Sequence, residues 1–149
     1  MKCYIFMFCF LSLGLMACSP KFATTAPKDT IFGKADAQSI LGSWIYNRTE
    51  KTHTVTIRMD IEIEKVRYDE TCIGANTEVG IRTVSRALVG KGKIAFIDAI
   101  FGTVQNGDLR CGLEFSATEY PVAISGNTLT LKTPTGTVSF ERIKNSTQF

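Results

Sequence analysis

A single histidine, His53, occurs in the 149 residues, and neither Cys72 nor Cys111 belongs to a CxxC pair. Zinc sites combine several His and Cys ligands, and a hydrolytic nucleophile needs a base beside it. His53 opens an alternating segment on the parity of its apolar residues, which is typical of a strand-end residue rather than a catalyst. We therefore predict no metal, no cofactor and no enzyme activity.

Neither sign of charge is in large excess. Lys and Arg number 17 against 14 Asp and Glu, the formal net charge is +3, and the basic residues are scattered. A nucleic-acid surface needs clustered basic residues, and a phosphate-binding loop needs a helix after its glycines. The glycine-rich stretch 90–93 joins two predicted strands instead. We expect neither nucleic-acid binding nor a phosphate-binding loop.

No apolar run is long enough to cross a bilayer as a helix, which takes about 20 residues. The uncharged run from Tyr4 to Ala17 follows Lys2 and stops at Cys18. A charged start, a short apolar centre and small residues before a break are typical of a cleaved export signal. We assign residues 1–17 to such a signal.

The end of this signal resembles the lipobox of bacterial lipoproteins, with Leu15 at −3, Ala17 at −1 and Cys18 at +1. The resemblance implies cleavage before Cys18 and acylation of both its thiol and the new amino terminus, and several acyl chains anchor a protein stably. Ser19 stands where an Asp would retain the protein in the inner membrane, which indicates the outer membrane. The alternative is a plain secretory signal with an incidental cysteine.

Residues 18–37 are rich in Ser, Thr, Ala, Pro and Lys and show no periodicity. Such a composition buries too little apolar surface to fold. We expect a lipidated, flexible tether with a reach on the order of 60 Å. The folded domain is expected over 38–144, with 145–149 as a disordered tail.

Two of the five cysteines, Cys72 and Cys111, remain in the mature domain once the signal is removed and Cys18 is acylated. An even pair in an oxidising periplasm indicates a disulfide. Two buried free thiols are the alternative.

The domain has the pattern of an all-β protein. Apolar and polar residues alternate from His53 to Ile63, which indicates a half-buried strand, and its apolar face comprises Val55, Ile57, Met59, Ile61 and Ile63. Glu62 and Glu64 fall on the opposite, solvated face. Similar segments follow at 77–89, 94–104, 109–115 and beyond, after a short helical turn from Gln38. We predict eight or nine short antiparallel strands, with Asn106-Gly107 at the centre of a hairpin turn.

The order of several motifs resembles that of lipocalins. Gly42-Ser43-Trp44 is similar to their Gly-x-Trp signature, Thr118-Glu119-Tyr120 to their Thr-Asp-Tyr turn, and Arg142 falls in the last strand. The resemblance covers about 38–144 and implies an up-and-down antiparallel barrel whose base Arg142 closes by stacking on Trp44. The stretch after Tyr120 holds one hairpin more than a standard lipocalin.

Two hypotheses for function follow from such a barrel. Eight-stranded barrels either hold one small ligand or are filled by side chains. In the first hypothesis the interior binds a small hydrophobic molecule, and the ligand-binding candidates are Val55, Ile57, Met59, Ile61 and Phe115. In the second, a filled barrel serves as a protein-interaction, inhibitor or accessory module in the periplasm. Asp98, the one acid in an apolar setting, is expected at a strand end near the barrel mouth.

Overall fold

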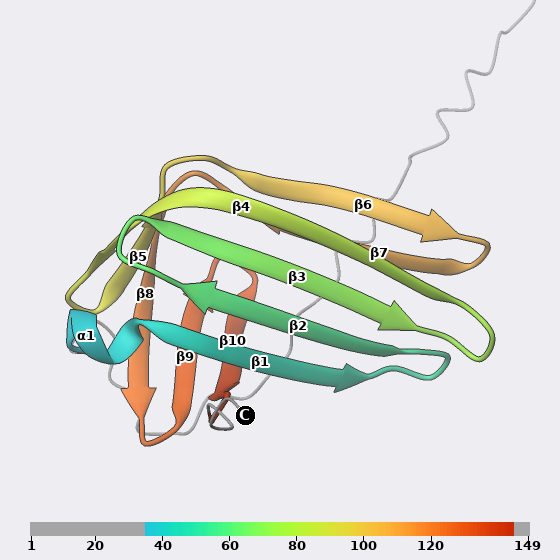
Figure 1. Cartoon of the computed structure of the whole chain (residues 1–149), viewed down its shortest axis with the longest axis horizontal. Helices are drawn as coiled ribbons and strands as arrows, with labels where there is room; N and C mark the ends of the chain where they lie inside the picture. Colours follow the sequence, from blue (N-terminus) through green and yellow to red (C-terminus); the bar gives the residue numbers. More distant parts are fainter. Residues whose placement is uncertain (1–34, 145–149) are drawn as a thin grey trace, which may run out of the picture.

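The computed structural model describes residues 35–144, which form one four-residue helix and ten β-strands (Figure 1). Their bounds are α1 Ala37–Ile40, β1 Gly42–Thr49, β2 Thr54–Ile61, β3 Lys65–Ile73, β4 Glu78–Gly90, β5 Lys93–Phe96, β6 Ile100–Asn106, β7 Leu109–Phe115, β8 Glu119–Ser125, β9 Thr128–Thr133 and β10 Gly136–Arg142. The predicted signal peptide 1–17, the predicted acylation site Cys18, most of the predicted tether and the predicted tail 145–149 lie outside the described residues. Within those residues, no helix has the length and apolar character needed to cross a bilayer.

Eight of the strands form one antiparallel sheet that closes on itself. Its order is β1-β10-β9-β8-β5-β4-β3-β2, and β1 also pairs with β2. The closing seam between β1 and β10 is short, because only Trp44 pairs with Arg142 and Ile45 with Glu141. Neighbours in the ring follow the chain order once β6 and β7 are set aside. The predicted all-β, antiparallel class is confirmed.

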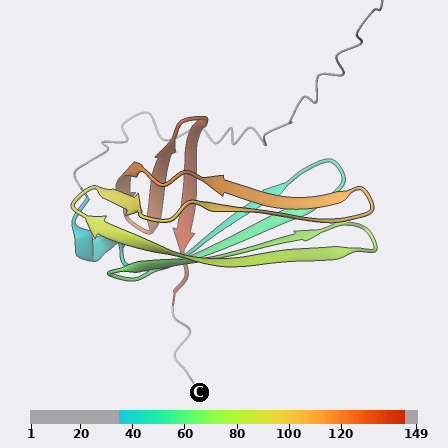
Figure 2. The same ribbon diagram turned by 90° about the horizontal axis from the view of Figure 1, so that it is seen from above.

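The strands of the ring differ in length and direction. β1–β4 are long and run side by side, whereas β8–β10 cross them close to α1 (Figure 1). The far ends of β1–β4 therefore extend well beyond the seam, as the second view also shows (Figure 2). Their turns, at 50–53 and 74–77, lie at the end opposite α1.

β6 and β7 form a separate two-stranded sheet that packs against β3 and β4 (Figures 1 and 2). The prediction of eight or nine strands was too low, because the segment 94–104 contains a turn between Phe96 and Ile100 that divides it into β5 and β6. Asp98 holds this turn through two hydrogen bonds of 2.8 Å from the Arg86 guanidinium. The additional hairpin, expected after Tyr120, is β6–β7, which precedes Tyr120 in the sequence and lies outside the ring of eight strands.

The register of β1–β4 lines up the side chains of the inner face in rows. One row is Trp44, Met59, Tyr68 and Thr83, and the next is Tyr46, Ile57, Glu70 and Ile81. The inner face of β2 ends at Ile61. The expectation that Ile63 continues it was wrong, because β2 stops and Glu62 N–H donates to Lys65 C=O in a turn, which leaves Ile63 66% exposed.

Candidate functional site

Trp44 and Arg142 lie together at the α1 end of the ring. The guanidinium carbon of Arg142 is 4.1 Å from the centroid of the buried Trp44 ring, and Trp44 Nε1–H donates to Ile40 C=O over 2.9 Å. Arg142 also donates to the carbonyls of Leu41 and Ser39. The arginine thus covers the tryptophan and binds the chain that leads into β1.

Gly42 is required at this end for two reasons. Its φ of +126° is one that residues with a side chain rarely adopt. A Cβ atom there would also lie 2.9 Å from Arg142 Nη1. The sequence prediction grouped Gly42, Trp44 and Arg142, and the structure brings all three into contact with the same turn.

The five ligand-binding candidates all lie in the core. Their exposed fractions are 4% or less for Val55, Ile57, Met59, Ile61 and Phe115. Side chains that line a calyx open to water keep part of their surface exposed, whereas these five are almost fully covered, and Ile61 also borders the hollow beside the β2–β3 turn. They pack on one another and on the rest of the core.

Phe115 reaches the core from outside the ring, because β7 is not one of the eight ring strands. Its ring stacks on Phe96 at a centroid distance of 5.2 Å. It also makes edge contacts with Tyr120 at 5.4 Å and Tyr68 at 6.2 Å. Such aromatic pairs each contribute about 0.5–1.5 kcal/mol beyond the area they bury. The β6–β7 hairpin therefore fills space that an open barrel would leave empty.

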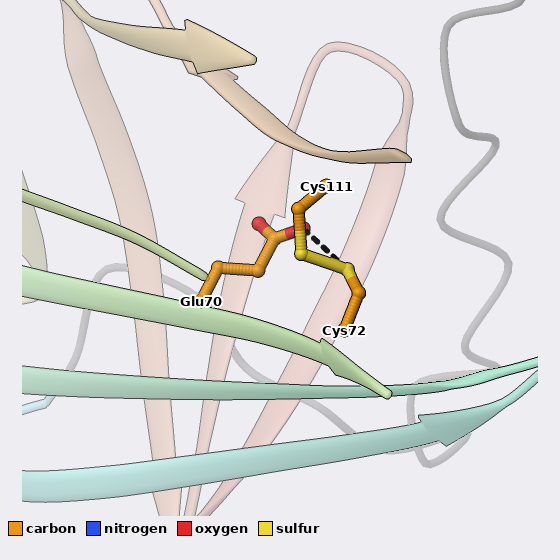
Figure 3. Close-up of side chains that lie close together, drawn as sticks. All are labelled: Glu70, Cys72 and Cys111. Carbon is orange, nitrogen blue, oxygen red and sulfur yellow. Dashed lines mark hydrogen bonds between the residues drawn. A yellow bond between two sulfur atoms is a disulfide. The ribbon is translucent and has the colours of Figure 1, made fainter. Parts of the chain in front are cut away.

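A disulfide between Cys72 and Cys111 fastens this hairpin to the ring, as the sequence predicted (Figure 3). It joins β3 to β7 across 39 positions of sequence, with a Cα–Cα distance of 5.7 Å, and both residues are fully buried. Tyr68, Glu70 and Cys72 alternate along the inner face of β3, which directs the bond toward β7.

Glu70, a buried carboxylate, lies beside the disulfide (Figure 3). Its Oε2 accepts from Tyr68 O–H over 2.8 Å, and its Oε1 accepts from Gly112 N–H over 3.1 Å. Oε1 also lies 3.7 Å from Cys72 Sγ. Buried charges are tolerated where hydrogen bonds satisfy them. Glu70 therefore connects β3 to the backbone of β7 next to the covalent link.

Sequence reasoning missed Glu70, although its parity with Val66, Tyr68 and Cys72 places it on the inner face. Burial raises the pKa of Tyr68 well above its ordinary value, and the negative charge of Glu70 raises it further. The Tyr68 hydroxyl therefore remains a donor to Glu70 throughout the neutral range.

One carboxylate oxygen of Glu70 and the sulfur atoms of Cys72 and Cys111 lie within 4.8 Å of one another. Both sulfurs are bonded to each other, whereas a metal would need them as thiolates. The cluster is also closed to substrates, because each of its side chains is buried. The cluster holds β3 and β7 together through the disulfide and the Glu70 hydrogen bond.

The remaining polar residues singled out in the sequence lie at turns and strand ends. His53 Nε2 is 3.3 Å from Glu50 Oε2 in the β1–β2 turn. The partly exposed Asp98 pairs with Arg86, whose hydrogen bond lowers the pKa of the Asp98 carboxyl. The hydroxyl of the buried Tyr120 accepts from Ser116 N–H over 2.8 Å. Glu62 and Glu64 lie in the β2–β3 turn. Beside His53, Thr52 Oγ1 also lies 3.2 Å from the ring nitrogen Nδ1.

An open hollow of about 590 Å³ lies beside the β2–β3 turn. Its walls are apolar at Leu41, Ile61 and Ile63 and charged at Glu62, Glu64 and Lys65.

No protein-family model matches the sequence, and no curated protein or solved structure matches it either.

Proposed function

We propose that this chain is a lipid-anchored protein of the bacterial outer membrane whose lipocalin-like barrel is filled and acts as a protein-interaction module in the periplasm. The anchor is supported by the lipobox-like residues Leu15, Ala17 and Cys18, and the outer rather than the inner membrane by Ser19. The lipocalin-like assignment is supported by the closed order of eight strands and by Gly42, Trp44 and Arg142 at one end.

The observation that carries the choice of function is the burial of the interior. Five side chains that would line a ligand site are 4% exposed or less. One end of the ring is covered by Arg142 and Trp44, and the β6–β7 hairpin, with its disulfide, packs on the inner face of β3 and β4. A rigid barrel filled in this way leaves recognition to its loops and exposed strands.

The turns at 50–53, 74–77 and 107–108 are the best candidates for partner contact. They gather at the end opposite α1 (Figure 1). Exposed residues such as Lys51, Asn76 and Asp108 lie there on three different hairpins. A partner would thus meet several short loops held in fixed positions by long, paired strands.

A second candidate function, binding of a small hydrophobic molecule, is favoured by the hollow beside the β2–β3 turn. Its volume of about 590 Å³ is in the range of small-molecule sites, and Leu41, Ile61 and Ile63 make it partly apolar. In that case the ligand would lie against the exposed Ile63 and not in the interior.

Site-specific photo-crosslinking in intact cells tests the interaction function. A photoreactive residue placed at Lys51, Asn76 or Asp108 is expected to give an adduct with a different envelope protein, identified by mass spectrometry. The same residue at the fully buried Met59 is the matched control and should give none. Absence of a heterologous adduct from all three loops would contradict the proposal.

A further inference from the structure

β6 differs from every other strand in its chemistry. Of the ten strands within residues 35–144, β6 alone contains no Asp, Glu, Lys or Arg, and it has no proline. Its Phe101 is 77% exposed, more than Ile63 or any other large apolar side chain in the described part of the chain. Natural edge strands usually carry charge, proline or a bulge, because an unprotected edge pairs with other chains.

The register of the hairpin defines which backbone groups of β6 face outward. Asn106 pairs with Leu109 across the two-residue turn at 107–108, so Ile100, Gly102, Val104 and Asn106 exchange hydrogen bonds with β7. The N–H and C=O groups of Phe101, Thr103 and Gln105 point away from β7. No backbone hydrogen bond to these three residues occurs within the described part of the chain.

The outer edge of β7 is already used. Its Gly112 N–H donates to Glu70 Oε1, and the exposed Arg110 and Glu114 flank that position. The hairpin is also held in place, because a Cβ on Gly102 would lie only 2.1 Å from Ile81 Cδ1 and Cys111 is bonded to Cys72. Only β6 therefore presents a fixed, uncharged edge.

We propose that β6 is a self-association edge, which pairs antiparallel with β6 of a second copy about a two-fold axis at Thr103. In this register Thr103 faces Thr103 of the other copy, and Phe101 faces Gln105. All the side chains brought together are uncharged, so two identical strands meet without the like-charge repulsion that other strands would suffer. The arrangement is isologous and closes at a dimer. A second copy is a partner distinct from the heterologous one proposed above.

Crosslinking of the mature chain, residues 18–149 with Cys18→Ser, tests the register. Paired residues that exchange two hydrogen bonds have Cα atoms about 5.5 Å apart, a separation that a disulfide spans. Thr103→Cys should therefore give a disulfide-linked dimer under mild oxidation. Gln105→Cys is the matched control, since the two copies of residue 105 would be about 14 Å apart. Equal crosslinking of both variants, or of neither, would overturn the proposed pairing.

The oligomeric state provides a second readout. Sedimentation of the same chain is expected to show twice the monomer mass at high concentration. Thr103→Lys places two like charges on the axis and should convert the dimer to a monomer, whereas Ala117→Lys adds the same charge at an exposed site outside β6 and should not. A mass that remains monomeric at every concentration would contradict self-association, as would open-ended growth. Neither result would affect the test for a heterologous partner.

Discussion

At the scale of single residues, Arg142 combines several roles. It stacks on Trp44, donates to the Leu41 and Ser39 carbonyls, and lies where a side chain on Gly42 would have to be. It also ends the strand that closes the ring. Arg142 therefore links the last strand, β10, to the segment that precedes the first strand, β1.

Arg142→Ala should therefore lower the free energy of unfolding by about 2–4 kcal/mol, since both a cation–π contact and charged hydrogen bonds are lost. Urea denaturation measures this change. Arg142→Lys keeps the charge but not the planar fork, and should recover only part of the stability. Arg82→Ala, which removes an exposed arginine paired with Asp69, is the control and should have little effect. Equal losses for Arg142→Ala and Arg82→Ala would contradict the closing role.

Tyr68 predicts a particular dependence of stability on pH. Its pKa in the folded protein is raised above the unfolded value of about 10. The stabilisation is then complete below about pH 10 and is lost as the pH rises toward the folded pKa. The free energy of unfolding should fall more steeply above pH 10 in the natural chain than in Tyr68→Phe, measured by denaturant titration at a series of pH values. Parallel curves for the two proteins would contradict this assignment.

The residue scale also shows what the sequence could and could not reveal. Alternation identified the buried positions of β2, from Val55 to Ile61, because period two is a local property. The same rule points to Glu70 on the inner face of β3. Its partner, the Gly112 backbone, could not be found, since the contact joins residues 42 positions apart on strands that do not pair.

At the scale of elements, the β6–β7 hairpin is the feature that departs most from the expected barrel. The sequence predicted a turn at Asn106-Gly107, and the hairpin is there, with its two loop residues shifted to Gly107 and Asp108. Gly107 supplies the positive φ, at +59°. The break between β5 and β6 was missed because the Arg86–Asp98 contact found there joins β4 to the turn after β5, and these positions are not neighbours in sequence.

The disulfide is the main restraint on this hairpin. Replacing Cys72 and Cys111 together by Ala removes a crosslink spanning 39 positions. Loop entropy predicts a loss of about 4 kcal/mol in the free energy of unfolding. Denaturation of the variant and of the natural protein measures this loss. Thiol counting first establishes that Cys72 and Cys111 of the natural protein are disulfide-bonded. Two free thiols in the untreated natural protein, or unchanged stability of the variant, would contradict the structural role.

At the scale of the whole molecule, the central question is whether side chains fill the interior of the closed ring. Met59→Ala would leave a cavity if the interior is filled, and should cost about 2–5 kcal/mol. Met59→Leu nearly conserves volume and should cost little. Both are read from urea denaturation. A lining residue of an open calyx would tolerate truncation, so a negligible effect of Met59→Ala would contradict the filled interior.

The proposed lipid anchor also concerns the whole chain. The natural precursor should incorporate labelled palmitate and fractionate with the outer membrane, because several acyl chains hold a protein stably. The Cys18→Ser precursor should incorporate none and leave the membrane fraction. Label that persists in the Cys18→Ser protein would show that another residue is acylated and would contradict the assignment of Cys18.

Native mass spectrometry of the mature protein, extracted gently from its own envelope, tests the filled barrel most directly. The burial of Val55, Ile57, Met59, Ile61 and Phe115 predicts that no small molecule adds to the mass of the chain or of its complexes with proteins. A defined additional mass of small-molecule size, lost on denaturation and retained when Ile63 in the outer hollow is replaced by Asp, would mean that the interior holds a ligand. That result would contradict the account.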